Sequence, residues 1–361
     1  MSTTHNTKVA FIGTGIMGAA IAGHILDAGY DLTVYNRTRE KAEGLLARGA
    51  AWAESPATAA EGADVVFTMV GYPTDVEDVY LASDGILRSA KKGAYLIDLT
   101  TSSPQLARDI HDASEVADVH AFDCPVTGGQ AGAEAGTLTL IMGASEATVE
   151  PVLPILQTFG KKFFYFEQPG AGQTAKLCNQ VSLASCMVGY ADALALAEQG
   201  HLDAEKVLDL LASGTGGSGA ASTLAPKSIA GDYKPGFMAE HLRKDIALAV
   251  TTAQDAELAL PGAETAFALF DTLCQVGGKR MGTQALTLLY AEEGDAVAAG
   301  LDWSLLDADA EGGCGCGGEG CDGEGGCGCG GHGHDDGHEC CGGHGHEHGH
   351  GEGHCCCHGE A

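Results

Sequence analysis

Short apolar runs alternate with longer amphipathic segments through the first half of the chain. The runs cover residues 9–12, 32–35, 65–70, 95–99, 119–123, 138–142 and 163–166. Two of the segments between them begin with serine followed by proline, at Ser55 and Ser103, a typical helix start with proline in the first helical position. Strands that alternate with helices form βαβ units, so the pattern predicts a mainly parallel sheet.

The pattern changes after Gly172. Apolar residues recur at helical spacing over 173–199, 203–213, 238–259, 262–277 and 283–293, with no strand-like run between them. We therefore expect an α/β Rossmann domain over 1–169 and an all-helical domain over 170–306. A cleft between them is expected at the carboxyl edge of the sheet, where open α/β folds bind ligands.

The chain from Asp307 onward has no lysine, arginine, valine, leucine, isoleucine or aromatic residue. Such a segment buries no apolar surface, so 307–361 is predicted to be disordered. Its thiols and imidazoles are ligands for Zn²⁺, Ni²⁺ or Cu⁺, although their spacing is not that of a single closed site. The alternative is a low-complexity tail with no selected function, and neither interpretation makes the metal part of catalysis. The candidate metal ligands are Cys314, Cys316, Cys327, Cys329, His344, His346, His348, His350, Cys355, Cys356 and Cys357.

The formal net charge of −30 argues against a nucleic-acid partner. No apolar run approaches the length of a membrane span, and the short polar segment before Lys8 does not resemble a secretory signal. The four cysteines before the tail are scattered without a disulfide pattern. We expect a cytoplasmic protein, assembled as a homodimer or homotetramer through apolar helices of its second domain.

The first strand leads directly into three glycines spaced Gly-x-Gly-x-x-Gly. Gly13 suits the tight turn, Gly15 a close approach to a pyrophosphate, and Gly18 close packing of helix on sheet. Cofactor contacts are expected from Gly13, Thr14, Gly15, Ile16, Met17 and Gly18. The alternative is an ordinary βαβ unit with a glycine-rich turn.

The second strand ends in Asn36-Arg37-Thr38. An NAD site usually has a carboxylate there for the ribose 2′-hydroxyl, whereas a guanidinium suits a 2′-phosphate. This end predicts NADP(H) over NAD(H). Alternatively, Arg37 is a solvated loop arginine and Thr38 caps the next helix.

Two further segments have candidate chemistry. Lys176 follows Gly170 and Gly172 near the start of a helix, where the helix dipole or burial lowers an ammonium pKa toward that of a general acid/base, and Asn179 lies at i+3. The glycine-rich loop around Thr127, Gly128 and Gly129 has free backbone N–H groups that can hold a small carboxylate. A surface lysine and a plain connecting loop are the alternatives.

Together with Lys244-Asp245 and the hydroxyl run Thr100 to Ser103, these motifs match a known family in order and spacing. The chain resembles the β-hydroxyacid dehydrogenases over about residues 8–300. The resemblance implies a Rossmann domain, an all-α domain and NAD(P)-dependent oxidation of a short 3-hydroxy acid. Two positions depart from the family pattern: Thr127 stands where serine is usual, and Gln180 where a second asparagine is frequent.

The resemblance also assigns roles by position. It implies that Lys176 is the catalytic acid/base, that Asn179 and the Thr127-Gly128-Gly129 loop bind the substrate, and that Thr101 and Lys244 contact the cofactor. Met69 and Val70, after the fourth strand, line the cofactor site as well.

We therefore predict an NADP(H)-dependent enzyme that interconverts a short hydroxy acid and its semialdehyde. The competing hypothesis is a metal-storage or metal-delivery protein that uses a dehydrogenase scaffold. A 6-phosphogluconate dehydrogenase is disfavoured by the short chain and by the lack of a histidine before Asn179, and an imine reductase by the presence of Lys176.

Overall fold

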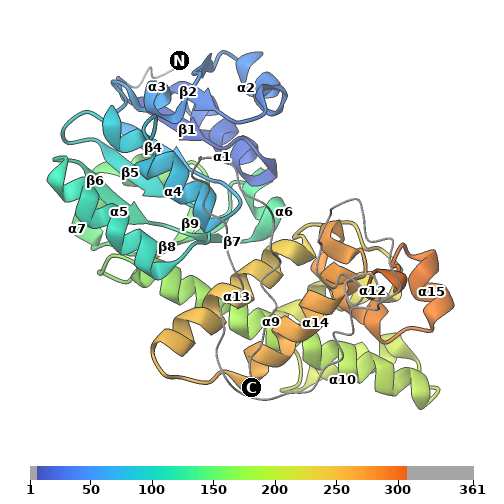
Figure 1. The fold of residues 1–361 in the computed structure, drawn as a ribbon. Coiled ribbons are helices and arrows are strands. Elements are labelled where there is room, and N and C mark those ends of the chain that lie inside the picture. The colour runs from blue at the N-terminus through green and yellow to red at the C-terminus, as the bar shows by residue number, and fades with distance from the viewer. Residues whose placement is uncertain (1–5, 307–361) are drawn as a thin grey trace, which may run out of the picture. The chain divides into compact units, whose positions relative to one another are not determined.

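The computed structural model describes residues 6–306 (Figure 1). Its N-terminal domain has a six-stranded sheet of order β3-β2-β1-β4-β5-β6 in which every neighbouring pair is parallel. The order reverses between β1 and β4, and in such sheets ligands bind at the carboxyl ends beside that reversal. The predicted Rossmann architecture is confirmed. The strands are β1 (Lys8–Ile12), β2 (Asp31–Tyr35), β3 (Ala51–Trp52), β4 (Val65–Thr68), β5 (Tyr95–Asp98) and β6 (His120–Asp123).

Helices connect these strands. Ser55 caps α3 by accepting from the backbone N–H of Thr58, and Ser103 caps α5 in the same way, as the serine-proline pairs predict. The helices of this domain are α1 (Ile16–Asp27), α2 (Glu43–Leu46), α3 (Pro56–Ala60), α4 (Pro73–Leu81), α5 (Pro104–Val116), α6 (Gly129–Glu134), α7 (Glu146–Val149) and α8 (Leu153–Leu156), with 3-10 turns η1 (Arg39–Ala42), η2 (Ile86–Arg88) and η3 (Glu150–Val152).

A second sheet of order β7-β8-β9 follows. Strand β7 (Val126–Thr127) is antiparallel to β8 (Leu138–Met142), which is parallel to β9 (Gly160–Tyr165). The two-residue strands β3 and β7 are too short to produce a recognisable alternation in the sequence, and neither was predicted.

The main sheet is buried on both faces. Val9 and Phe11 of β1 belong to one apolar cluster, while Ala10 and Ile12 belong to another, and all four side chains are at most 1% exposed. Continuous apolar runs in place of strict alternation are therefore what this sheet requires, because a parallel strand covered on both sides has no solvent-facing positions.

The second domain is helical, as predicted. It has its own apolar cluster, which includes Tyr190, Phe270 and Leu286. Its helices are α9 (Ala171–Gln199), α10 (Ala204–Ser213), α11 (Gly219–Thr223), α12 (Ala225–Ile229), α13 (Ala239–Asp255), α14 (Pro261–Gln275) and α15 (Glu293–Ala298), with 3-10 turns η4 (Gly278–Arg280) and η5 (Thr283–Leu289).

One helix prediction needs correction. Residues 283–293 do not form a single α-helix: η5 is a 3-10 helix, and α15 begins only at Glu293. The four residues of η5 from Thr283 to Leu286 are almost fully buried. They include the polar Gln284, whose amide donates to the carbonyls of Asp232 and Lys234. Tertiary hydrogen bonds of this kind override the local helical periodicity.

Helix α9 is the one described helix whose length and apolar composition match a membrane span. Its interior face nevertheless has three buried polar side chains, those of Gln173, Lys176 and Gln180. Because both glutamines hydrogen-bond to other parts of the protein, we interpret α9 as a core helix of the two-domain fold.

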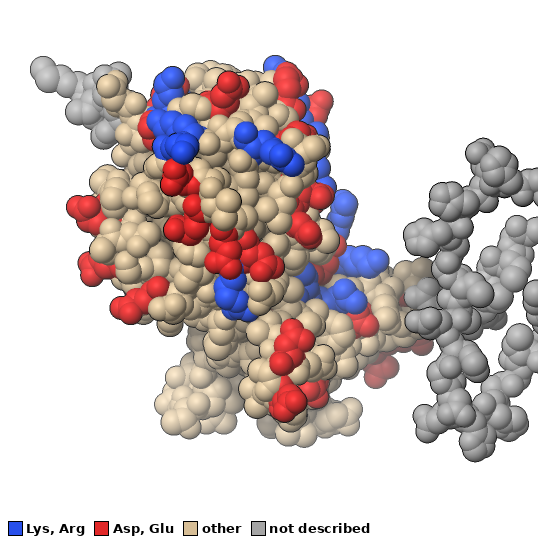
Figure 2. Space-filling model, turned by 60° about the vertical axis from the view of Figure 1, so that its left-hand side comes forward, with Lys and Arg blue, Asp and Glu red and all other residues tan. Residues whose placement is uncertain are grey.

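Acidic and basic side chains are interspersed on the face shown in Figure 2. The exposed ion pairs of the described chain include Lys92 with Asp118 and Arg48 with Asp27. Such pairs contribute little to stability because water and salt screen them. The pair of Lys244 and Asp245, described below, is much more buried.

Candidate active site

The turn after β1 has the steric requirements of a dinucleotide fingerprint. Gly13 has φ +98°, and a Cβ there would lie 2.1 Å from the carbonyl oxygen of Met69. A Cβ on Gly18 would lie 1.9 Å from the carbonyl oxygen of Gly13. Both positions exclude any side chain, so α1 packs against the turn as closely as backbone permits.

Gly15 differs from the other two glycines of the motif, Gly13 and Gly18. A Cβ built there would meet no atom of the described chain within 4 Å, and Gly15 is the N-cap of α1 without a side-chain cap. The hydroxyl of Thr14 is buried and has no hydrogen-bond partner among the described residues. Open space, uncapped helix N–H groups and an unpartnered hydroxyl together fit the phosphates of a dinucleotide.

The end of β2 is built around Asn36. Its side-chain oxygen accepts from the backbone N–H of Thr14, and its amide donates to the carbonyl of Thr38. Asn36 therefore fixes the glycine turn to the end of β2. Thr38 precedes η1 without a capping bond from its side chain. Arg37 is largely exposed and forms an ion pair with Asp75, the NH1 nitrogen lying 2.8 Å from Oδ1.

The segments after β4 and β5 are joined to each other. The backbone N–H of Met69 donates to Ile12, and that of Val70 to the hydroxyl of Thr100. The carbonyl of the neighbouring Thr101 accepts from Lys244 Nζ at 2.5 Å. The structure thus brings together four predicted cofactor residues, Met69, Val70, Thr101 and Lys244, although the last belongs to the helical domain.

The start of α9 is held against the sheet by Asp123. Its two carboxylate oxygens accept from the backbone N–H groups of Gly170 and Gln173, at 2.8 and 2.7 Å. Gly172 lies so close that a Cβ would be 2.6 Å from the nitrogen of Gly143. The glycines before Lys176 are therefore needed for close packing.

Gln173 ties the same helix to the loop after β5. It is fully buried, its oxygen accepts from Ser102, and its amide donates to the carbonyl of Thr100 at 2.7 Å. The loop that includes Thr101 and the helix that includes Lys176 are thereby linked through one side chain.

Lys176 is 6% exposed, and its side-chain ammonium forms no hydrogen bond within residues 6–306. Burial is the main cause that lowers its pKa to about 8; Asp245 opposes the shift, and Lys244 adds to it. Burial, one of the two causes that the sequence suggests for a lowered pKa, is thus present at Lys176. An ammonium that titrates near neutral pH is suited to general acid/base chemistry.

Asp245 is the functional candidate that the sequence argument left out. It is 2% exposed, Oδ2 accepts from the amide of Gln180 at 2.6 Å, and Oδ1 lies 3.0 Å from Lys244 Nζ. The Lys-Asp pair at the start of an apolar helix resembles a solvated helix face in the sequence. The sequence did contain one signal. Asp245 stands at helical spacing from Leu242, Ile246 and Ala249, and the structure buries all four on one face of α13.

The loop with Thr127 approaches the helical domain. Gly128 and Gly129 have φ values of +133° and +61°, and a Cβ on Gly129 would lie 3.8 Å from the carbonyl of Gly236 in the helical domain. Successive glycines of this kind turn backbone N–H groups outward. Asn179 is exposed although it is only three residues from the buried Lys176, so the two side chains differ in environment.

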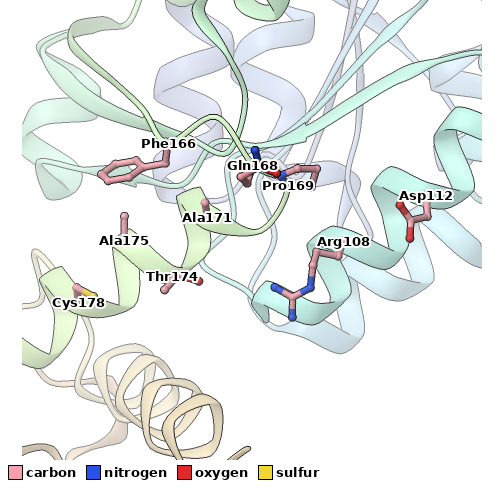
Figure 3. Close-up of a pocket in the computed structure, with 9 residues that line it drawn as sticks. All are labelled: Arg108, Asp112, Phe166, Gln168, Pro169, Ala171, Thr174, Ala175 and Cys178. Atoms are coloured by element: carbon pink, nitrogen blue, oxygen red, sulfur yellow. The ribbon is translucent and has the colours of Figure 1, made fainter. Parts of the chain in front are cut away.

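A surface pocket of about 610 Å³ lies beside α9 but belongs to a different part of the surface (Figure 3). Thr174, Ala175 and Cys178 line it from α9, and Arg108 and Asp112 from α5. None of the residues predicted from the sequence is among its lining residues, so we do not assign the chemistry to it.

Within residues 6–306, no group of three or more histidine, cysteine, aspartate or glutamate side chains could hold a metal ion. The metal ligands predicted between Cys314 and Cys357 lie outside the described residues.

Comparisons with known proteins agree with this geometry. The family model for the NAD binding domain of 6-phosphogluconate dehydrogenase matches residues 8–167, and the model for NAD-binding of NADP-dependent 3-hydroxyisobutyrate dehydrogenase matches residues 170–290. An NAD-dependent L-serine dehydrogenase of Pseudomonas aeruginosa is 36% identical over 277 residues, which are 75% of this chain and 93% of that protein.

Two solved structures resemble the fold closely. Mycobacterium tuberculosis 3-hydroxyisobutyrate dehydrogenase with L-serine has a TM-score of 0.74 and 29% identity, and the match covers 79% of this chain and 99% of that one. Psf3 in complex with NADP⁺ and 2-OPP has a TM-score of 0.71 and 28% identity, with coverage of 78% and 100%.

The fold, the glycine turn and these matches define an oxidoreductase that uses a nicotinamide cofactor. More particularly, the chain belongs to the β-hydroxyacid dehydrogenase family, which includes 3-hydroxyisobutyrate dehydrogenase.

Proposed function

We propose that this protein interconverts a short hydroxy acid and its semialdehyde with NADP(H) preferred over NAD(H), and that Lys176 is the general acid/base. The observation that carries the proposal is the environment of Lys176: a buried ammonium with a pKa of about 8 and without a hydrogen-bond partner in the described chain. A buried ammonium that forms no hydrogen bond destabilises the folded protein, and strongly shifted ionisable groups of this kind are concentrated at functional sites.

The cofactor would be held by the turn from Gly13 to Gly18, by Arg37 and by the loops at Val70 and Thr101. When bound, the nicotinamide supplies or accepts the hydride. In the reducing direction, the Lys176 ammonium donates its proton to the carbonyl oxygen and stabilises the negative charge that develops there. In the oxidising direction, the neutral amine accepts the proton from the hydroxyl group.

The substrate would be a small molecule with a carboxylate. Backbone N–H groups at Gly128 and Gly129 are the candidates to hold it, with Thr127 and Asn179 beside the reacting end. This agrees with the small hydroxy acids named for the relatives, 3-hydroxyisobutyrate and L-serine. NADP(H) preference is supported by Arg37 and by the absence of a carboxylate in the sequence at the end of β2.

The test is a panel of short semialdehydes, assayed with NADPH and NADH and with and without chelator. Lys176→Ala should lower turnover by at least about a hundredfold while NADPH still binds, because only the proton transfer is lost. Lys162→Ala, which changes an exposed lysine, is the matched control. Near-normal turnover of the Lys176 variant would remove that residue from catalysis, and a strict NADH requirement would refute the cofactor preference.

A cytoplasmic location and a homodimeric or homotetrameric assembly stay predictions. Fractionation of cells and the mass of the purified protein in solution would test them.

A further inference from the structure

The ion pair of Arg37 and Asp75 connects two strands that are not neighbours. Arg37 follows β2, and Asp75 lies in the first turn of α4, which follows β4. In the sheet, β1 lies between β2 and β4. The pair therefore spans the carboxyl end of β1, where the glycine turn begins and where a dinucleotide binds in this type of sheet.

The two partners differ in how firmly they are held. The Asp75 side chain is 15% exposed, and its second oxygen accepts from the backbone N–H of Tyr72 at 3.1 Å. A carboxylate in the first turn of a helix is also stabilised by the helix dipole. Arg37 is 79% exposed, and within residues 6–306 Asp75 is its one ion-pair partner. Asp75 is thus held in place, whereas the exposed Arg37 side chain can leave Asp75 and bind another anion.

A 2′-phosphate would be that other anion. It would have to share the Arg37 guanidinium with Asp75 or displace the carboxylate, and it would meet the negative charge of Asp75 in either case. NAD(H) has no phosphate at this position, so its binding leaves the pair intact and incurs no such cost. The sequence showed no acidic residue at the end of β2, but the fold supplies one from α4.

We propose that Asp75 is a specificity-determining residue for the cofactor, which competes with the 2′-phosphate for Arg37 and so weakens the preference for NADP(H) over NAD(H). This inference rests on the proposed role of Arg37. It gives the pair a function that neither residue has alone: Arg37 favours the phosphorylated cofactor, and Asp75 limits that advantage.

The test measures binding, so it does not depend on turnover. Dissociation constants of NADPH and NADH would be measured by the fluorescence of the bound cofactor for the full chain and for Asp75→Asn, Arg37→Met and the double variant. Asparagine keeps an oxygen that can accept from Tyr72, so α4 should still form, and Asp75→Ser is a second variant if Asp75→Asn folds poorly. Asp78→Asn, an exposed change on the same helix, is the matched control.

Asp75→Asn should tighten NADPH binding about tenfold, because the Arg37 guanidinium no longer has to give up its ion pair with a carboxylate before it binds the 2′-phosphate. It should change NADH binding less than about twofold, because NADH has no phosphate at this position. Asp78→Asn should change neither. An unchanged or weaker affinity for NADPH in both Asp75 variants would overturn the proposal.

The Arg37 variants separate this inference from the cofactor preference itself. If Arg37→Met leaves NADPH binding unchanged, the proposed role of Arg37 in the preference for NADP(H) is wrong, and the inference about Asp75 is wrong with it. If Arg37→Met weakens NADPH binding but Asp75→Asn has no effect, only the role of Asp75 is wrong. An effect of Asp75→Asn that is equally large in the Arg37→Met background would show direct repulsion of the phosphate and refute competition for Arg37.

Discussion

The burial that suits Lys176 to its proposed role in proton transfer should also destabilise the folded protein. Its pKa of about 8 lies below the ordinary value of 10.5 because burial disfavours the ammonium. The unfolded chain binds the proton more tightly than the folded protein, so the free energy of unfolding rises with pH between these two values. Below about pH 8 the penalty is fully present, and above about pH 10.5 it has disappeared.

The size of this penalty follows from the shift. Each pKa unit corresponds to about 1.4 kcal/mol, so a shift of this size destabilises the folded protein by about 3 kcal/mol at pH 7 and by about 1 kcal/mol at pH 9.5. Lys176→Met removes the charge and keeps an unbranched side chain of similar length. We expect the variant to lose turnover and to be more stable than the parent protein at pH 7 by about the first amount.

Urea unfolding at pH 7 and pH 9.5 is the measurement, with turnover assayed on the same preparations. Lys162→Met is the control, because an exposed lysine has no burial penalty to remove. The reasoning is refuted if Lys176→Met is no more stable than the parent protein at pH 7, or if its advantage does not shrink at pH 9.5.

Four further outcomes follow from the structure. The kcat/KM for reduction should fall as pH rises through about 8, and that for oxidation should rise, because the two directions need the charged and neutral forms of Lys176; flat profiles would contradict the assignment. Gln173→Leu should destabilise the protein by about 2–4 kcal/mol in urea unfolding, since two buried backbone groups lose their partners, and Gln168→Leu at an exposed position should not. Gly18→Ala should abolish NADPH binding in a fluorescence titration, because its Cβ would overlap the carbonyl of Gly13. Burial raises the pKa of Asp98 to about 7, so the free energy of unfolding of the parent protein should fall as pH rises from about 4 to 7. Asp98→Asn should lack this dependence. In urea unfolding above pH 7, the variant should be more stable than the parent protein by up to about 4 kcal/mol.

The sequence predicted the fold well because the strands of this sheet are apolar on both faces. Runs such as that of β1 stand out even in single-sequence patterns, and Ser55 and Ser103 mark helix starts through a local capping bond. The sequence did not predict two kinds of element. Strand β7 has only two residues, and η5 is not an α-helix because Gln284 hydrogen-bonds to carbonyls that are distant in the sequence. No local period encodes either feature.

The residues of the candidate site were likewise predictable where the signal is local and unpredictable where the contact is tertiary. The glycine turn and Lys176 could be predicted because their chemistry lies within one short segment. The long-range partners of the site residues could not be predicted, since Asp75 reaches Arg37 from helix α4, and Asp245 and Lys176 are 69 positions apart in the sequence. Gln180, a departure from the family pattern, acquires a meaning only in the structure, as the donor to Asp245.

Gly172 shows how a residue without a side chain can set the position of a reactive group. Its Cα lies against backbone of β8 and the carboxylate of Asp123, so even the methyl group of alanine would push α9 away from the sheet. Lys176 is four residues along the same rigid helix and would be displaced with it. A screen for inactive variants should therefore find Gly172→Ala among them, although this glycine has no group that touches substrate or cofactor. The position of the proposed proton donor therefore depends in part on a residue that has no side chain.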